Sequence, residues 1–222
     1  MSVNSERRLN VKIDRQDMAP LSANQFQLQV AKSVMSKGKL IFNLVWQSTI
    51  LAPNTTISWK PVYGFNWTSD VPADGISVSC GGDWVQCNLG QAVDIDSNGF
   101  FVPSTVKPDP AYMMIGKNGY KAQSPDGLRI VIGVQNRAGN FEPVFVDPVS
   151  INLNMSATFQ PQEELQWWYD SGSKQATMFT DHQTPFETAS FSKPDVQTNT
   201  FFKTSTYNVQ DGAWVTAASK CE

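Results

Sequence analysis

One stretch of this chain occurs twice, and this repetition constrains the fold more than any other feature of the sequence. Residues 56–70 and 156–170 align without a gap, with a proline, a tryptophan and an aspartate at matching positions. In this alignment Trp67 falls on Trp167. Repetition within a chain indicates a fold built from similar units. We therefore expect two pseudo-symmetric halves packed through the apolar faces of the repeats, with both tryptophans largely buried.

Most of the chain alternates apolar and polar residues, as half-buried β-strands do. The alternation is clear over residues 26–30 and 40–46, and it is most regular over residues 151–159. No window longer than ten residues shows helical spacing. We expect twelve to fourteen short strands separated by turns. This pattern predicts an all-β protein, an antiparallel β-sandwich or a flattened barrel.

Two stretches do not follow the strand pattern. Residues 1–22 are charged and have no clear period, so we expect an N-terminal arm with at most a short helix. Residues 103–127 contain four prolines and several turn signals, as a long connection does. Residues 23–222 of the 222-residue chain, including this connection, are predicted to form a single domain. Its halves are expected at about 23–102 and 128–216.

Charge and hydropathy exclude several partners. The net charge is −3, the isoelectric point is about 5.2 and there is no basic stripe, so we expect no nucleic-acid partner. No apolar run is long enough for a transmembrane helix. Residues 1–15 lack the apolar segment of a secretory signal. We therefore expect a cytoplasmic protein, or one secreted without a classical signal.

Familiar catalytic motifs are missing from the sequence. His182 is the only histidine, and there is no G-x-S-x-G, G-x-G-x-x-G or P-loop sequence. His182 is expected in a turn or at the surface, with ligand binding or proton transfer as the alternative. Glu163 and Glu164 are neighbours that an extended strand sends to opposite faces, so they are not expected to act as a pair.

Asp94, Asp96 and Asn98 stand at alternate positions just before a glycine, as at the start of a calcium-binding loop. The flanking segments are predicted strands, and the twelfth position is Thr105 where an EF-hand has glutamate. An EF-hand is therefore excluded, but a weaker calcium site remains open. The alternative is a plain β-hairpin without a cofactor, because Asn-Gly alone explains a tight turn.

The cysteines leave a second question open. Cys80 and Cys87 flank a Gly-Gly-Asp sequence and could form a disulfide across a hairpin, or remain two thiols. Cys221 has no evident partner. An odd count without a C-x-x-C motif argues against a zinc site.

Aromatic residues are the informative excess: seven tryptophans, thirteen phenylalanines and five tyrosines. Trp168 is predicted on the strand face opposite Trp167, beside Gln166 and Asp170. An exposed tryptophan near amide and carboxylate groups can stack on a sugar ring or enter a lipid headgroup layer. The alternative is that Trp168 packs under a loop or in a subunit contact. The predicted ligand-binding residues are Trp168, Asp170, Gln166, Tyr63 and His182.

Two classes of function remain open. The first is a non-enzymatic binding protein, lectin-like or membrane-lipid-recognising, of the defence or toxin type. Its expected partner is a carbohydrate or a lipid headgroup. The second is a cofactor-free enzyme of isomerase, cyclase or hydrolase type, which acts on a small apolar substrate between the halves. Such an enzyme needs an Asp or Glu with a raised pKa. The missing motifs favour the first class.

Overall fold

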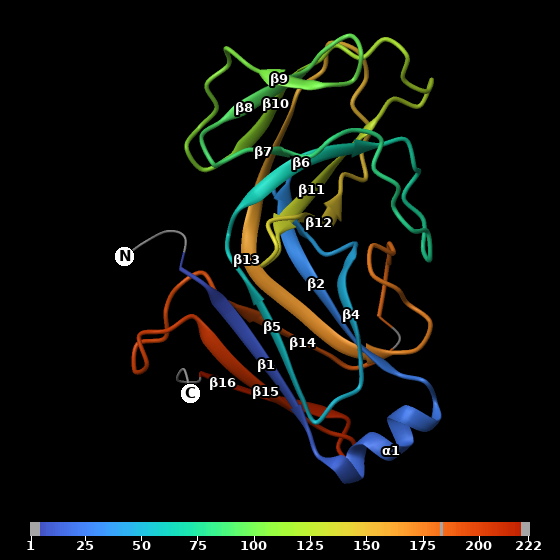
Figure 1. Ribbon diagram of the computed structural model, residues 1–222, viewed down its shortest axis with the longest axis vertical. Coiled ribbons are helices and arrows are strands. Elements are labelled where there is room, and N and C mark those ends of the chain that lie inside the picture. Colours follow the sequence, from blue (N-terminus) through green and yellow to red (C-terminus); the bar gives the residue numbers. More distant parts are fainter. Residues whose placement is uncertain (1–4, 183, 219–222) are drawn as a thin grey trace.

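The structure is a computed structural model that describes residues 5–182 and 184–218, and within these ranges it contains sixteen strands and one short helix (Figure 1). The elements are β1 (Arg7–Ile13), α1 (Arg15–Ala23), β2 (Gln27–Ser36), β3 (Lys39–Ile41), β4 (Val45–Ile50), β5 (Asn54–Trp59), β6 (Tyr63–Thr68), β7 (Val85–Gln86), β8 (Ala92–Ile95), β9 (Phe101–Pro103), β10 (Met113–Asn118), β11 (Arg129–Gln135), β12 (Phe141–Val146), β13 (Ala157–Asp170), β14 (Phe186–Ser190), β15 (Phe202–Asn208) and β16 (Ala213–Ala218).

These strands form three packed sheets, which confirms the predicted all-β sandwich. The first sheet has the order β16-β15-β1-β5, and the second has the order β3-β2-β13-β10-β8-β9, with β4 added to β2 and β14 added to β13. The third sheet has the order β12-β11-β6-β7. Strand β13 curves along much of the long axis and joins the two ends of the molecule (Figure 1). Most pairs are antiparallel, but β1 is parallel to β15 and β10 is parallel to β8.

Most buried apolar side chains belong to one cluster to which all three sheets contribute. Two smaller clusters lie outside it, one around Val131 and Met178 and one around Trp168. The second sheet is therefore covered on both faces around β13. In the described part of the chain, no helix has the length and apolar character needed to cross a membrane.

The two copies of the repeat form different structures. The first copy is divided between β5 and β6, which belong to different sheets, whereas the second copy forms the single long strand β13. Strand β6 pairs with β7 and β11, and β13 pairs with β2, β10 and β14. The predicted pseudo-symmetry of the halves is not confirmed.

Both repeated tryptophans are buried, as predicted, but their surroundings differ. Trp67 is 8% exposed, and its indole N–H donates to the Gly99 carbonyl at 2.9 Å. Trp167 is fully buried, and its indole N–H donates to the Ser205 hydroxyl at 3.1 Å. The tryptophans share burial, but they contact unrelated parts of the fold.

Two hairpin turns contain residues with positive φ angles. Lys37 and Gly38 connect β2 to β3 with φ angles of 50° and 75°, which suit the twist of paired strands. Gly99 connects β8 to β9 with a φ of 92°, a conformation that favours glycine.

The N-terminal arm that we expected does not form over residues 7–13. These residues form β1, which lies inside the first sheet between β15 and β5. Leu9, Val11 and Ile13 of this strand are buried in the main core. Arg8, Asn10 and Lys12 fill the positions between them, and the charges of this run led us to expect an arm.

Two other expectations about strands are also wrong. The connection predicted over residues 103–127 contains β10, whose Met113 and Ile115 are fully buried. The regular alternation over residues 151–159 predicts one strand, but β13 begins only at Ala157. Before it, Asn154 has a φ of 66°, so the chain makes a turn there.

Strand β13 contains a bulge that changes the direction of its side chains. Val34 pairs with Pro161 and Lys32 pairs with Leu165, so three residues of β13 lie opposite Ser33 alone. A bulge of this kind bends a strand and re-aims its side chains. As a result Glu163 points into the interior, where only 12% of its side chain is exposed.

Candidate binding site

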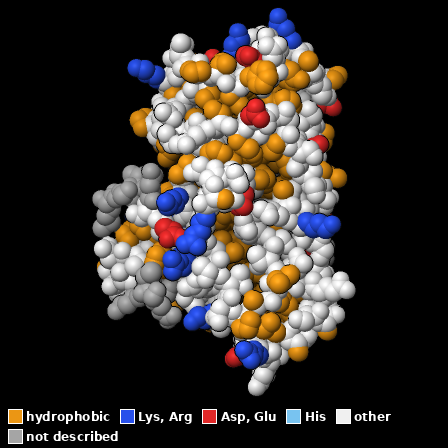
Figure 2. Space-filling model, in the orientation of Figure 1, with side chains coloured by type: hydrophobic (Ala, Val, Ile, Leu, Met, Phe, Trp, Pro, Cys, Tyr) orange, Lys and Arg blue, Asp and Glu red, His pale blue; other side chains and the backbone are white. Residues whose placement is uncertain are grey.

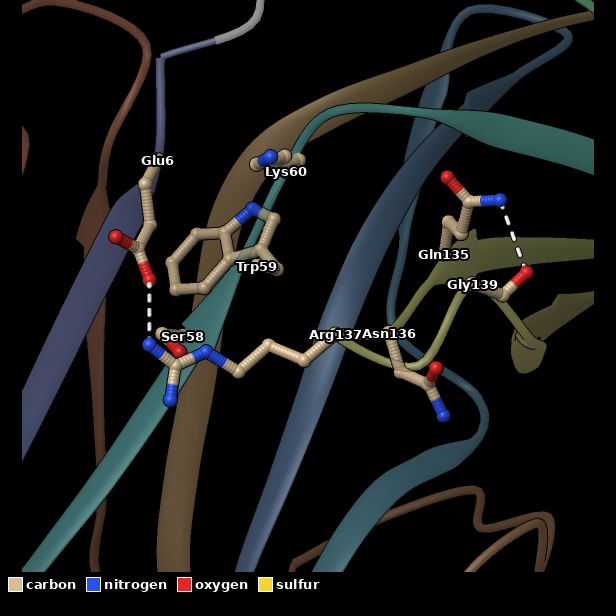
Figure 3. A pocket seen from close by; sticks show the side chains of 8 residues that line it. All are labelled: Glu6, Ser58, Trp59, Lys60, Gln135, Asn136, Arg137 and Gly139. Carbon is tan, nitrogen blue, oxygen red and sulfur yellow. Dashed lines mark hydrogen bonds and ion pairs between the residues drawn. The ribbon is translucent and has the colours of Figure 1, made fainter.

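A pocket of about 510 Å³ lies where the end of β5 meets the turn between β11 and β12 (Figure 3). Its lining residues come from three segments that are distant in the sequence: Glu6, Ser58, Trp59, Lys60, Gln135, Asn136, Arg137 and Gly139. Only 2% of Trp59 is exposed, so its indole forms the floor of the pocket and does not project from it. The rim supplies amide, hydroxyl, carboxylate and cationic groups around this floor.

The turn that forms one side of the rim is fixed by its own hydrogen bonds. The Asn136 side-chain oxygen accepts hydrogen bonds from the backbone N–H groups of Ala138 and Asn140, both at 3.0 Å. The Gln135 amide donates to the Gly139 carbonyl at 2.9 Å (Figure 3). The polar groups of this turn are therefore held in place before any ligand arrives.

The charged groups of the rim are less constrained. Arg137 extends from the turn across the pocket toward Glu6, as Figure 3 shows, and the closest charged atoms are 3.9 Å apart. The Arg137 side chain is 83% exposed. An exposed ion pair of this length contributes at most about 1 kcal/mol, so Arg137 can turn to a ligand at low cost. Lys60 is also exposed and lies on the other side of Trp59 (Figure 3).

Hydrogen bonds and ring contacts connect the floor of the pocket to its rim. The Trp59 indole N–H donates to Glu163 at 2.7 Å, and the ring packs edge-to-face on Trp46 with centroids 5.7 Å apart. The Trp46 indole N–H in turn donates to Glu142 at 2.9 Å. The second oxygen of Glu142 accepts a hydrogen bond from the Asn136 amide, also at 2.9 Å. Each tryptophan is therefore held by its own carboxylate.

Glu163 is the centre of a charged cluster behind Trp59. Besides the indole N–H, it accepts hydrogen bonds from the Tyr63 hydroxyl and from the Lys32 ammonium group, the latter at 3.1 Å. Arg7 Nε lies 3.6 Å from the same carboxylate. Lys32 is fully buried and also donates to the Gln162 carbonyl in the bulge at 2.6 Å. Glu163 therefore accepts hydrogen bonds from β2, β5 and β6 and forms an ion pair with β1.

The pKa values in this cluster follow from burial and from charge. Burial raises the pKa of Glu163, but the charge of Lys32 and the hydrogen bonds from Tyr63 and Trp59 outweigh burial and bring that pKa below its ordinary value. Burial lowers the pKa of Lys32, although Glu163 opposes this shift. Burial and the neighbouring carboxylate both raise the pKa of Tyr63. Glu163 therefore stays ionised at neutral pH.

Three of the five predicted ligand-binding residues lie together, but not as an exposed site. Gln166 and His182 share a hydrogen bond of 2.7 Å, and the His182 ring packs edge-on against Trp168 at 4.3 Å between centroids. Burial lowers the pKa of His182. Asp170 lies on the same face of β13 and accepts a hydrogen bond from Ser173. Tyr63 lies elsewhere, in the Glu163 cluster.

The expectation that Trp168 is exposed is wrong. Trp168 is only 3% exposed and packs with Ala31 and Val45 of the neighbouring strands and with Phe179. We inferred exposure from its polar neighbours in the sequence. The segment around residue 178 folds over this face of β13 instead, with a bridge between Leu44 and Met178. Ligand binding by these residues stays a prediction.

The residues of the possible calcium site lie in the β8–β9 hairpin. One oxygen of Asp96 accepts hydrogen bonds from the backbone N–H groups of Asn98, at 2.8 Å, and Phe100, at 3.0 Å. This carboxylate thus stabilises the turn. Within the described residues, no group of three or more His, Cys, Asp and Glu side chains is placed to hold a metal ion.

The two cysteines of the possible disulfide are free thiols. Cys80 is exposed and Cys87 is buried. Burial raises the pKa of the Cys87 thiol to about 11, and partial desolvation of the sulfur together with the charge of Asp70 raises the pKa of Cys80 to about 11, so neither is a reactive thiolate at neutral pH. Cys221 lies outside the described residues.

Sequence reasoning missed most of the pocket. It assigned no role in binding to the turn at residues 137–140, and it interpreted Trp59 only as part of the repeat. One signal was present in the sequence: Lys32 interrupts an otherwise uncharged strand segment, and a lysine in a buried strand requires a carboxylate partner. Nothing in the sequence pointed to Glu163 as that partner.

Compared with models of protein families, with curated proteins and with solved structures, the chain matches none of them. What the site can do therefore follows from its own geometry.

Proposed function

We propose that this protein is a non-enzymatic binding protein that recognises a small polar ligand of carbohydrate type in the pocket over Trp59. The observation that carries this proposal is the β11–β12 turn on the rim, whose hydrogen-bonding groups are already fixed above an indole floor. A rim that is ordered in advance loses little conformational entropy when a ligand binds. The proposal keeps the class of function that the sequence favours, but it moves the site from Trp168 to Trp59.

The chemistry of the lining supports a sugar more than an apolar ligand. Sugars present hydroxyl groups at their edge and C–H groups on their faces. Gln135 and Ser58 offer neutral hydrogen-bonding groups, and Arg137 and Lys60 offer cationic donors. The small exposed part of the Trp59 indole offers a limited apolar contact for C–H groups at the floor. The volume of about 510 Å³ falls within the range of about 300–1,000 Å³ that is usual for small-molecule sites.

The enzyme alternative receives less support. It calls for an acidic side chain with a raised pKa at the substrate. Glu163 is the most heavily hydrogen-bonded carboxylate of the site, but its pKa is lowered, and it does not line the pocket. Its donors instead hold Trp59 in place, which suits a positioning role in ligand binding.

A glycan array with the purified protein tests the proposal, followed by calorimetry on any glycan that binds. Arg137→Ala and Lys60→Ala should each weaken binding by roughly ten-fold or more, because a charge-assisted hydrogen bond contributes about 1.5–3 kcal/mol. Both side chains are exposed, so the melting temperature should stay nearly unchanged.

Arg15→Ala is the matched control, since Arg15 is an exposed arginine at the start of α1 that does not line this pocket. It should bind like the unmodified protein. The proposal fails if no glycan binds, or if the Arg137 and Lys60 variants bind as well as the control does.

A further inference from the structure

Three turns meet at the end of the molecule that lies opposite α1 (Figure 1). They are residues 96–100 of the β8–β9 hairpin, residues 117–121 at the end of β10 and residues 152–155 before β13, and we call them together the distal tip. Backbone hydrogen bonds join them: Lys121 donates to Ser97 at 3.4 Å, and Asn118 donates to Met155 at 2.9 Å.

Two of these three turns carry large exposed apolar side chains. Phe100 is 59% exposed at the hairpin, and Leu153 and Met155 are 45% and 47% exposed on the turn before β13. Figure 2 shows hydrophobic side chains gathered at this end of the visible face, with Lys or Arg side chains at its outermost edge and Asp or Glu side chains close to them. Single exposed apolar residues are common, but a group of them on joined turns indicates an interaction surface.

The charged side chains of the distal tip are two lysines and one aspartate, so its net charge is +1. Lys117 and Lys121 are exposed on the turn at the end of β10. The three segments contain one carboxylate, Asp96, and the backbone of the hairpin already occupies one of its oxygens. The protein as a whole has a net charge of −3, so this end differs in charge from the average surface.

We propose that the distal tip docks on an anionic lipid surface. Phe100, Leu153 and Met155 enter the headgroup region, where their apolar surface leaves water. Lys117 and Lys121 stay at the level of the anionic headgroups, which attract them. This inference does not rest on carbohydrate binding, because no residue of the distal tip lines the pocket over Trp59.

The shape of the distal tip favours a lipid surface over a protein partner. Stable protein interfaces bury about 1,200–2,000 Å² in total and need complementary shapes. The distal tip instead presents a few protruding side chains on three turns. A soft headgroup layer accepts such side chains without a matching groove.

Sedimentation with vesicles of phosphatidylcholine, with and without phosphatidylserine, tests the inference; neither vesicle contains a glycan. The protein should bind the vesicles that contain phosphatidylserine, and high salt should weaken this binding. Lys117→Gln and Lys121→Gln should each lower the partition coefficient about five-fold, since one basic residue near an anionic surface contributes ~1 kcal/mol. The double variant Phe100→Ser with Met155→Ser should lower it by about ten-fold or more.

Ile50→Ser is the matched control, because Ile50 is 78% exposed at the end of β4, away from the distal tip. It should sediment like the unmodified protein, and all variants should keep the same melting temperature. The inference is overturned if the protein ignores anionic vesicles at low salt, or if the variants of the distal tip bind as the control does. Concentration-dependent dimers that the same variants abolish, without vesicle binding, would assign the surface to a second copy of the chain.

Discussion

At the scale of single residues, the site depends on a carboxylate that never meets the ligand. Glu163 accepts the indole N–H of Trp59 and also the donors of Lys32 and Tyr63. A buried ion pair contributes little net stability compared with apolar packing, but removing one partner leaves the other charge uncompensated. The Glu163 cluster therefore holds Trp59 in position. Replacing one carboxylate oxygen of Glu163 with an amide group should disrupt this cluster.

Glu163→Gln should destabilise the protein by about 3–5 kcal/mol, because the buried Lys32 then has no counter-charge. Urea unfolding measures this loss. Glu164→Gln is the matched control, since Glu164 is the next residue and its carboxylate makes no hydrogen bond or ion pair with any residue that the structure describes, although its charge acts on Lys32 from a distance. The control should cost less than about 1 kcal/mol, as surface substitutions do. Equal losses in both variants would contradict a special role for Glu163.

The same pair of proteins should show a defined pH dependence. The pKa of Glu163 is lower in the folded state than its ordinary value of 4.5, so its charge stabilises the fold at pH values above 4.5. This stabilisation is lost as the pH falls below 4.5 and through the lowered pKa. The difference in unfolding free energy between the unmodified protein and Glu163→Gln should therefore be constant near neutrality and shrink in acid. A difference that grows in acid would contradict the direction of the shift.

Trp168 illustrates how a residue-level inference changes with its surroundings. It is buried beside Val45 and Phe179, so Trp168→Ala should cost about 3–5 kcal/mol through lost packing. Thermal or urea unfolding measures this cost. Phe186→Ala is a useful comparison, because Phe186 is 49% exposed next to the same His182 ring and should cost much less. A Trp168→Ala protein of normal stability would restore the exposed tryptophan that the sequence suggests.

At the scale of elements, alternation predicts the existence of strands better than their partners. It identifies β2 and both buried repeat tryptophans, because a period of two decides which face a side chain takes, but the strand expected over residues 40–46 is divided between β3 and β4. It places Glu163 and Glu164 on opposite faces but gives no sign of the bulge between Pro161 and Leu165. A bulge depends on the pairing of two strands that are distant in the chain, and no local pattern encodes that pairing.

The same limit explains the missed elements and the missed site. Strand β1 contains charged residues at alternate positions, and its place in the sheet comes from β15, almost 200 residues later in the chain. The pocket brings together Glu6, the end of β5 and the β11–β12 turn, and none of these segments carries a motif by itself. The class of fold follows from local patterns, whereas the site follows from contacts between distant segments.

At the scale of the whole molecule, the two proposed surfaces are carried by one framework but occupy different regions. The pocket is built on β5 and the β11–β12 turn, and the distal tip is built around β8, β9 and β10. No lining residue of the pocket belongs to the distal tip. Two sites are coupled only through an element that has two arrangements. Ligand binding at each site must then shift the equilibrium between these arrangements. The rim turn and the β8–β9 hairpin are each held by their own hydrogen bonds.

We therefore expect the two binding events to be independent. Saturating anionic vesicles should leave the Kd for the glycan within about two-fold, because sites without shared partners contribute additively. Calorimetry in the presence and absence of vesicles measures this Kd, and the Phe100→Ser, Met155→Ser double variant serves as the control that cannot dock. Linkage is reciprocal, so any change in glycan affinity must appear as an equal change in vesicle affinity. A change of ten-fold or more in both affinities would contradict this expectation, because it corresponds to a coupling free energy of about 1.4 kcal/mol between the two sites. It would mean that β13, which runs between the two regions, transmits this coupling and that the framework is less rigid than its hydrogen bonds indicate.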